Sequence, residues 1–264
     1  MKNILVPIGS SENSINTLQY AIDFADEVGA NIFVLRAYNV QSKAGTIIDV
    51  NAILERESNL YMRSMINSVD RKGKDIQLIS AKGNVVDSVA SVDKEIGVDL
   101  IMMGPKSNSI KEEVFLGATS GSVVKQSNIP VLIVPESYAF KSFNSVLTAF
   151  KSGKVIEKSA LKPLAFVKNH FNPVINLLLV KTPGYVDGDL VIDETLETLK
   201  SSLKITENAT TFQGVLEHFQ SNNPDMLCVF RRKRGFFKKL WEKNSVLKKE
   251  FHCNVPLLVL SGKA

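Results

Sequence analysis

Residues 98–135 read VDLIMMGPKSNSIKEEVFLGATSGSVVKQSNIPVLIVP, and their pattern indicates an α/β arrangement. It begins with a short apolar run, residues 98–103, which is typical of a strand covered on both faces, and Gly104 ends that run. A polar loop follows, and Gly117 then precedes small and hydroxylated residues that suit a helix start with free backbone N–H groups. Such a helix end can hold an anion. The stretch closes on an apolar segment with a proline at each end, so it predicts strand, loop, helix and strand in succession.

The same alternation extends back to the N-terminus. Residues 2–8, KNILVPI, have the composition of a buried strand, and Ser11 or Asn13 is the expected cap of the helix that follows. Strands separated by helices cannot form hairpins, and right-handed crossovers stack them into a parallel sheet with helices on both faces. The remaining elements expected before residue 98 are a helix over 14–29, a strand over 30–38, a helix over 50–72, a strand over 75–80 and a helix over 85–97.

The second half of the chain repeats this order. FNSVLTAF at 143–150 stands where the first strand stood, and helices and strands alternate after it, beginning with a helix predicted over 155–171. SNIPVLIVPE at 127–136 and HCNVPLLVLSG at 252–262 share a polar, apolar, proline, apolar pattern. We therefore predict an α/β fold with two tandem domains, 1–136 and 143–264, each a five-stranded mostly parallel sheet between helices.

Composition sets limits on the class of protein. The 264 residues are 44% hydrophobic and 22% charged, as expected for a globular protein. No apolar run approaches the roughly 20 residues that cross a bilayer, and the N-terminus has no secretion signal, so we expect a cytoplasmic protein without a transmembrane segment. Cys228 and Cys253 belong to no disulfide framework and to no metal-binding spacing. No metal is expected.

Positive charge is concentrated in the second half. Residues 1–138 carry 13 Lys and Arg against 16 Asp and Glu, and the rest of the chain carries 19 against 11. The segment from Arg231 to Lys249 is strongly basic, with Glu242 as its one acidic residue, and Phe236, Phe237, Leu240 and Trp241 lie among the basic residues. A basic amphipathic segment suits an anionic partner such as a membrane surface, a nucleic acid or an acidic protein. The alternative, which we favour, is a solvated loop whose aromatic residues pack on the domain.

These features resemble the universal stress protein family in its tandem form. The resemblance rests on ILVPIGSSENS at the first strand–helix turn, on KGNVVDSV at the third, and on the stretch that follows Met103. The family signature is Gly, two residues, Gly, nine residues, Gly, and then Ser or Thr. The corresponding residues here are Gly104, Ser107, Gly117 and Ala118, with the spacing intact. The resemblance implies a fold like that of the adenine nucleotide α hydrolases.

What the resemblance implies for the site follows from the signature. In family members that bind ATP, the first glycine lets the ribose and phosphates approach, the second allows a tight turn, and the third begins the helix whose amides hold phosphate. The cofactor implied is therefore ATP or another adenine nucleotide. The nucleotide-binding residues implied are Pro7, Ile8, Gly9, Ala37, Met103, Gly104, Ser107, Gly117, Ala118, Thr119 and Ser120.

Three residues of this implied site depart from the family pattern. ATP-binding members usually carry Asp where this chain has Gly9. Ser107 replaces the second glycine and restricts φ, and Ala118 removes a hydroxyl that Thr119 or Ser120 could replace. These three residues leave two alternatives, a nucleotide site that is retained and one that is lost or altered. In the second half the phosphate loop is replaced by the basic segment, so a nucleotide is expected in the N-terminal domain only.

The resemblance implies a stress-response binding or signalling protein rather than an enzyme, with its two domains paired through their last strands as a pseudo-dimer. A homodimer is a further possibility. No Walker loop, GxGxxG fingerprint or G-x-S-x-G elbow is present, and no general base is identifiable near the loop. Two alternatives stay open. One is slow ATP hydrolysis, and the other is a nucleotide-free interaction protein that acts through residues 231–249.

Overall fold

The computed structural model describes residues 1–11, 13–39, 50–105, 118–155, 157–231 and 254–261. These residues form two compact units, each with its own buried core. The first unit contains the described residues up to 105 together with 118–129 and 136–140, and the second contains 130–135 and the described residues from 141 onward.

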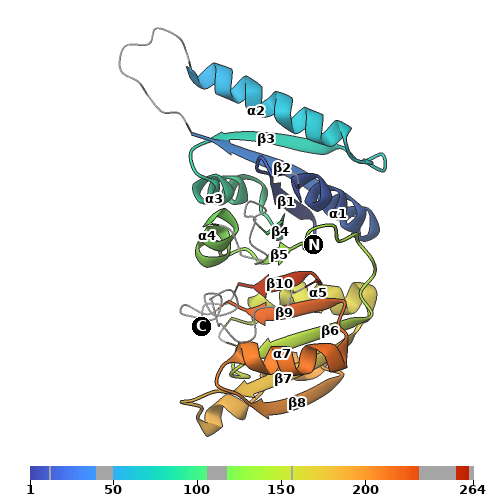
Figure 1. Ribbon diagram of the computed structural model, residues 1–264, viewed down its shortest axis with the longest axis vertical. Helices are drawn as coiled ribbons and strands as arrows, with labels where there is room; N and C mark the ends of the chain where they lie inside the picture. The colour runs from blue at the N-terminus through green and yellow to red at the C-terminus, as the bar shows by residue number, and fades with distance from the viewer. Residues whose placement is uncertain (12, 40–49, 106–117, 156, 232–253, 262–264) are drawn as a thin grey trace. The chain divides into compact units, whose positions relative to one another are not determined.

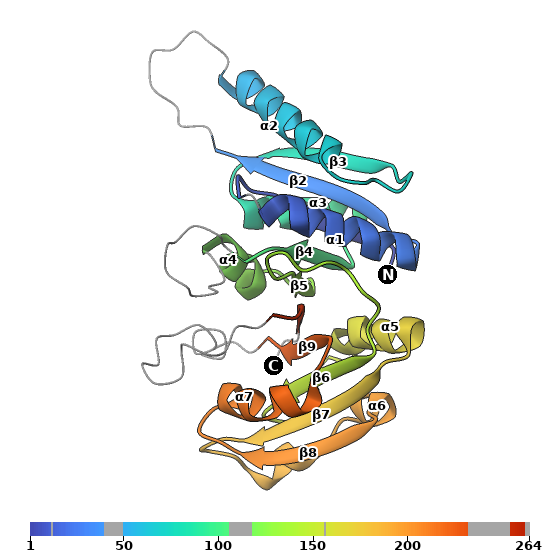
Figure 2. The ribbon, with the colours of Figure 1, turned by 45° about the vertical axis from the view of Figure 1, so that its right-hand side comes forward.

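The first unit is built on a parallel sheet with the strand order β3-β2-β1-β4. From β1, the chain adds β2 and β3 at one edge of the sheet through α1 and α2, and α3 then leads back to β4 at the other edge. Because each crossover is right-handed, α1 and α3 lie on opposite faces of the sheet (Figures 1 and 2). The elements are β1 (Asn3–Pro7), α1 (Asn13–Val28), β2 (Asn31–Tyr38), α2 (Val50–Asn67), β3 (Ile76–Lys82), α3 (Val85–Ile96), β4 (Leu100–Met103) and α4 (Ala118–Gln126).

Hydrophobic burial explains why the central strands form where they do. Ile4, Leu5 and Val6 of β1 are fully buried, and all four residues of β4 are buried, as the continuous apolar runs predict for strands covered on both faces. Helix α3 begins at an Asn84 cap, whose side chain accepts a hydrogen bond from the Asp87 N–H.

The second unit has a mixed sheet with the strand order β5-β10-β9-β6-β7-β8. Its strands are parallel except for β5, which pairs antiparallel with β10 so that Leu132 lies opposite Leu258. Strand β5 comes from the first half of the sequence. The elements are β5 (Val131–Ile133), β6 (Ser145–Phe150), η1 (Lys158–Leu161), α5 (Lys162–Phe171), β7 (Val174–Lys181), η2 (Asp187–Leu190), α6 (Glu194–Leu199), β8 (Ser202–Glu207), α7 (Thr211–Asn222), β9 (Met226–Phe230) and β10 (Leu257–Leu260).

The segment 136–140 packs onto α1 within the first unit. The Phe140 ring makes edge-to-face contacts with Tyr20, at a centroid distance of 5.5 Å, and with Phe24, at 5.6 Å. Tyr138 contacts Tyr20 at 6.3 Å. Tyr20 itself is 1% exposed. Aromatic pairs in this geometry stabilise beyond their buried area, so these residues extend the core of the first unit.

The predicted α/β fold class, with mostly parallel strands flanked by helices, is confirmed, and within the described residues each half of the chain contributes five strands. Two predicted helix boundaries differ. The helix expected over 155–171 is a short 3₁₀ turn followed by α5, because Pro163 occupies the first turn of α5, where proline is tolerated, and would interrupt a longer helix. The helix expected to reach residue 72 ends at Asn67, before a turn in which Lys72 and Gly73 both have positive φ.

Within the described residues, no helix is both long and apolar enough to span a membrane.

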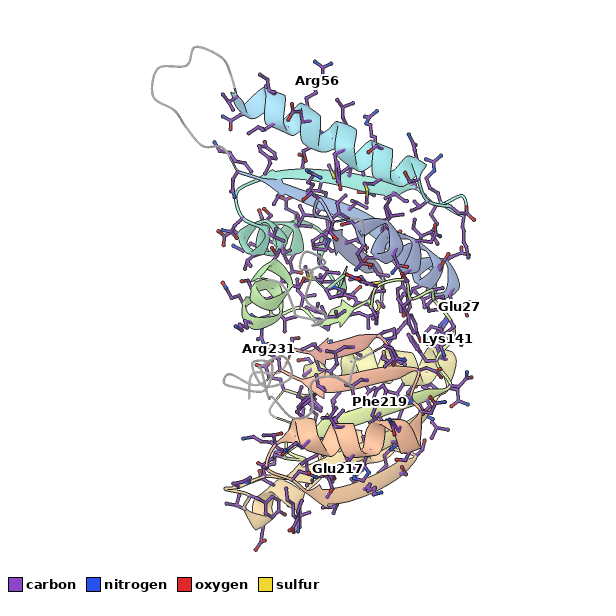
Figure 3. The ribbon with its side chains drawn as sticks, viewed as in Figure 1. Glu27, Arg56, Lys141, Glu217, Phe219 and Arg231 are labelled. Carbon is purple, nitrogen blue, oxygen red and sulfur yellow. The ribbon has the colours of Figure 1, made fainter. Side chains whose placement is uncertain are left out.

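Asp225 ties the start of β6 to the end of the α7–β9 connection. Its carboxylate accepts the N–H groups of Asn144 at 2.8 Å and Ser145 at 3.1 Å, and the Lys141 ammonium lies 2.6 Å away (Lys141 is labelled in Figure 3). Burial alone would raise the pKa of Asp225, but these hydrogen bonds outweigh it and hold the pKa below its ordinary value. A carboxylate with a lowered pKa stabilises the fold above its unfolded pKa, and that contribution is lost as the pH falls through the folded pKa.

Asp225→Asn should therefore lower the free energy of unfolding at neutral pH by about 1–3 kcal/mol, because the charged acceptor of three donors is lost. The difference from the wild-type protein should shrink as the pH falls below about 4. Urea unfolding at several pH values measures both effects. Glu136→Gln, which neutralises an exposed carboxylate, serves as the control. An Asp225→Asn variant as stable as the control at neutral pH would refute this role.

Candidate functional site

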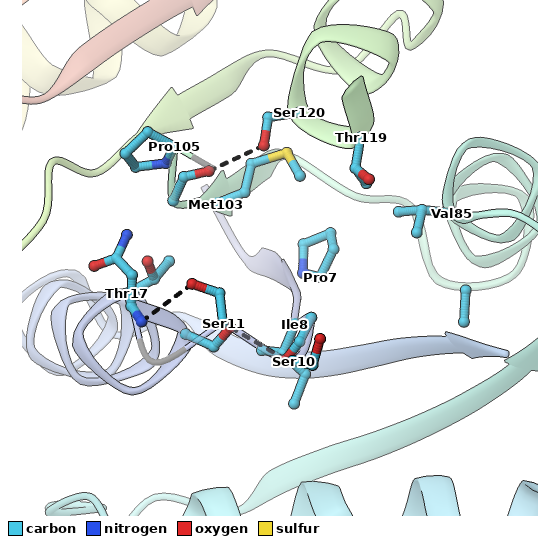
Figure 4. A pocket seen from close by; sticks show the side chains of 15 residues that line it. Pro7, Ile8, Ser10, Ser11, Thr17, Val85, Met103, Pro105, Thr119 and Ser120 are labelled. Carbon is cyan, nitrogen blue, oxygen red and sulfur yellow. Dashed lines mark hydrogen bonds between the residues drawn. The ribbon is translucent and has the colours of Figure 1, made fainter. Parts of the chain in front are cut away.

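A cavity of about 260 Å³ lies beyond the carboxyl ends of β1 and β4 in the first unit (Figure 4). Strand β1 lies between β2 and β4. The strand order reverses here, because strands β2 and β3 are added on one side of β1 and β4 on the other. In open α/β sheets ligands bind in the crevice at such a switch point. The volume is just below the range of about 300–1,000 Å³ that is typical of small-molecule sites. The cavity is thus placed and sized for a small ligand.

Eight of the residues implied by the sequence come together at this cavity. They are Pro7, Ile8, Gly9, Ala37, Met103, Gly104, Thr119 and Ser120. Ser107 and Gly117 lie outside the described residues, and of Ala118 only the backbone, at the first position of α4, belongs to them. Residues separated by more than 100 positions in the sequence therefore line the same cavity of the first unit.

The turn after β1 is held in place by its own hydrogen bonds. The Gly9 carbonyl accepts the Tyr61 hydroxyl at 2.9 Å and the Ser14 hydroxyl at 3.3 Å. The Ile8 N–H donates to the Leu35 carbonyl at 2.9 Å. The Arg36 guanidinium lies 3.6 Å from the centre of the Tyr61 ring and supports it by a cation–π interaction. These contacts fix the Gly9 carbonyl at the cavity.

Gly9 has no structural need to be glycine. Its φ is not positive, and a Cβ built on it meets no atom within 4 Å. A side chain at this position would therefore extend into open space beside the cavity without backbone strain.

Gly104 differs, because a Cβ there would lie 2.5 Å from Nδ2 of Asn13 and 2.9 Å from Oγ1 of Thr17. Helix α1 thus packs directly against the Cα of Gly104. The resemblance explains this glycine by the approach of a ligand, and the structure adds a second cause within the chain itself.

The start of α4 supplies hydroxyl groups to the cavity. Ser120 is 6% exposed, and its hydroxyl donates to the Gly104 carbonyl at 2.9 Å, so that hydroxyl is already engaged (Figure 4). Thr119 is exposed, and we find no hydrogen bond of its hydroxyl within the described part of the chain. The Thr119 hydroxyl, rather than that of Ser120, is therefore available to donate to a ligand in place of the hydroxyl that Ala118 lacks.

The described lining of the cavity contains no charged side chain. Ile8, Ala37, Val85 and Met103 supply apolar surface, which suits a flat aromatic base, and the turn after β1 and the start of α4 supply hydroxyl groups. No general acid or base is therefore found among these lining residues. Across the described residues, no group of three or more His, Cys, Asp or Glu could hold a metal ion.

Seven further residues line the cavity that the resemblance does not imply, namely Ser10, Ser11, Asn13, Ser14, Thr17, Val85 and Pro105. Ser11 was interpreted only as a helix cap, and its hydroxyl does accept the Asn13 N–H, at 3.3 Å. Helical spacing could have indicated two of these residues, because positions 13 and 17 lie on the same face of α1, close to the turn after β1. Their neighbour Gly104 is distant in sequence, so only the fold reveals the contact.

The corresponding turn of the second unit is covered by its own chain. After β6, the Gly153 N–H donates to the Asp189 carbonyl at 2.9 Å, and the Gly153 carbonyl accepts the Asp193 N–H at 3.0 Å. A Cβ on Gly153 would lie 2.6 Å from Cδ1 of Ile192. The segment after β7 therefore packs where a ligand would approach this turn.

The basic segment from Arg231 to Lys249 lies outside the described residues except for Arg231. The Arg231 N–H donates to the Leu260 carbonyl at 2.9 Å. Partial burial lowers the pKa of its guanidinium from the usual value.

Comparison with known proteins places this geometry in one family. A model described as the universal stress protein family matches residues 1–135. A universal stress protein of Methanocaldococcus jannaschii is 22% identical over 138 residues, which cover 50% of this chain and 81% of the relative. The universal stress protein YxiE of Bacillus subtilis is 27% identical over 143 residues, covering 50% of this chain and 97% of YxiE.

A crystal structure of a universal stress protein from Archaeoglobus fulgidus resembles the whole chain. The match covers 98% of both chains with a TM-score of 0.71 at 22% identity, and it shows the fold of both halves. The chain belongs to the universal stress protein family of stress-response proteins, in its tandem form.

Proposed function

We propose that the first unit binds an adenine nucleotide in the cavity beyond β1 and β4, and that the protein acts in the stress response as a binding or signalling module. The observation that carries the proposal is the convergence of eight implied nucleotide-binding residues on one cavity at the switch point of the sheet. The first unit is the one that we propose to hold the nucleotide, because the corresponding turn in the second unit is covered by residues 189–193.

In this proposal the adenine lies against the apolar surface of Ala37, Val85 and Met103, and the phosphates face the start of α4. A helix N-terminus favours negative charge through its free N–H groups and its dipole. Helix α4 has nine residues, and its first turn reaches the cavity at Thr119. We assign no catalytic role, since the described lining offers no charged side chain that could activate water or hold a metal.

The domain arrangement is also a proposal, with boundaries at 1–136 and 143–264. The antiparallel pairing of β5 with β10 supports a pseudo-dimer formed through the last strands of the two halves. The cytoplasmic location, a homodimer and an anionic partner at Arg231–Lys249 stay predictions.

Isothermal titration with ATP, ADP and AMP tests the proposed function. The protein should first be unfolded and refolded, or extensively dialysed, so that any copurified nucleotide is removed, and mass spectrometry of the released material identifies it. Saturable heat at micromolar to millimolar nucleotide is the expected result. Absence of binding heat at millimolar concentrations of all three nucleotides would refute the proposal that the first unit binds an adenine nucleotide.

Thr119 and Ser120 should respond differently to loss of their hydroxyl groups. Thr119→Ala should weaken ATP binding by about tenfold with little effect on stability, because one hydrogen bond to a charged oxygen is lost. Ser120→Ala should instead lower the free energy of unfolding by about 1 kcal/mol, because the Gly104 carbonyl loses its donor. Titration and urea unfolding of both variants measure the contrast. Equal ATP affinity in Thr119→Ala and wild type would exclude a contact between Thr119 and phosphate.

A further inference from the structure

Two buried polar side chains beside the cavity lack hydrogen-bond partners. Asn13 is 9% exposed and Thr17 is 2% exposed. Within the described residues, neither Nδ2 of Asn13 nor Oγ1 of Thr17 has a partner. Burying a polar atom without a partner costs folding free energy, and such atoms in native proteins call for an explanation.

These two atoms lie side by side at the edge of the cavity. Asn13 and Thr17 are four residues apart on α1, so their side chains occupy the same face of the helix. Both residues line the cavity, and both atoms come within 2.9 Å of the point where a Cβ on Gly104 would lie. The pair therefore sits where α1 meets the end of β4, next to the Gly104 carbonyl that Ser120 holds.

The chemistry of the pair favours a negatively charged acceptor. An amide nitrogen donates only, and a threonine hydroxyl can donate as well. Both groups lie in the first two turns of the 16-residue helix α1, where the helix dipole favours negative charge. No Asp or Glu is found among the described lining residues to repel an anion. An oxyanion is the ligand group that matches two donors at a helix start.

We propose that Asn13 and Thr17 form a phosphate subsite of the cavity. When a ligand binds, the Asn13 amide and the Thr17 hydroxyl rotate about their side-chain bonds toward the cavity, and each donates a hydrogen bond to a phosphoryl oxygen. The proposal rests on the proposed function, since the phosphate belongs to the bound nucleotide. The subsite gives the protein selectivity for phosphorylated nucleosides over adenosine.

Two substitutions that preserve shape test the subsite by titration with ADP and adenosine. Thr17→Val removes the hydroxyl, and Asn13→Asp replaces the donor with a negatively charged acceptor. We expect ADP affinity to fall about tenfold in Thr17→Val and roughly 10- to 100-fold or more in Asn13→Asp, with adenosine affinity unchanged. Thr198→Val is the matched control, because Thr198 is an exposed threonine of the second unit whose hydroxyl donates to the Thr195 carbonyl.

The unliganded protein gives a second readout that a structural role for Thr17 would not give. Because its buried hydroxyl has no partner, Thr17→Val should raise the midpoint of thermal unfolding by a few degrees, about 2–4 °C, while it weakens ADP binding. A hydroxyl that holds the fold together would instead lower the midpoint when removed. Lower stability together with unchanged ADP affinity would overturn the subsite.

The remaining outcomes separate the subsite from the proposed function. If both variants bind ADP as tightly as wild type does, the subsite is wrong and the nucleotide site stands. The same conclusion follows if the affinities of the variants for adenosine and for ADP fall by the same factor. If wild type binds no adenine compound, the proposed function fails, and inorganic phosphate alone then decides the subsite. Phosphate binding by wild type that Asn13→Asp abolishes supports it, and no phosphate binding by wild type overturns it.

Discussion

Replacing Gly9 by Asp should raise the affinity for ATP by roughly 10- to 100-fold. Resemblance to ATP-binding members of the family implies Asp at this position, where its carboxylate contacts the nucleotide. One hydrogen bond to a charged group contributes about 1.5–3 kcal/mol, which corresponds to that factor. The structure can accommodate the change, because Gly9 lines the cavity, has no positive φ and leaves space for a Cβ. We therefore expect that a nucleotide site with Gly9 lacks one carboxylate contact and that Asp at this position restores it.

Titration of Gly9→Asp and Gly9→Asn with ATP measures this gain. Asn has the same shape without the charge, so it separates the carboxylate from the bulk of a new side chain. We expect Asn to give at most a small part of the increase. A Gly9→Asp variant that folds normally and binds ATP no better than wild type would show that the nucleotide, if bound, does not approach this turn as it does in other family members.

Leu258→Pro should destabilise the second unit by about 3 kcal/mol or more. Leu258 is 2% exposed and lies in β10 between Leu132 of β5 and Cys228 of β9. Proline at a central strand position removes a ladder hydrogen bond, and the leucine side chain loses its burial as well. The effect reports on the pairing of β10 with β9 and on the burial of the Leu258 side chain.

Urea unfolding of Leu258→Pro should show the loss, and Leu258→Val provides the control. Valine keeps the strand hydrogen bonds and removes one methylene, so it should cost only about 1 kcal/mol. If the proline variant were no less stable than the valine variant, the Leu258 N–H would not be hydrogen-bonded to β9 as the parallel register requires.

The sequence predicted the fold well because its strands are strongly patterned. The apolar residues of KNILVPI and those before Gly104 are buried, and these runs are too short for an ordinary helix, so their length favours strands. The shared pattern around Pro130 and Pro256 also pointed to two matching strands, and these strands do pair. Helix α5 begins later than its apolar pattern predicts, because Pro163 occupies the first turn of the helix, where proline is tolerated.

The candidate site was predictable only in part. Gly104 could be placed because the signature spacing is intact, and Gly9 could be placed because it directly follows the first strand. The contact of Asn13 and Thr17 with Gly104 joins positions about 90 residues apart through the packing of α1 on β4, and no local pattern encodes it. The engagement of the Ser120 hydroxyl by the Gly104 carbonyl is likewise a tertiary contact, and it decides which hydroxyl is available.

We propose that the cavity beyond β1 and β4 holds an adenine nucleotide. A crystal structure of the protein grown with ADP tests it most directly. We predict electron density for the nucleotide in this cavity, with the base against Ala37 and Met103 and a phosphate within hydrogen-bond distance of Thr119. An empty cavity at saturating ADP, or ADP bound elsewhere on the chain, would contradict the account.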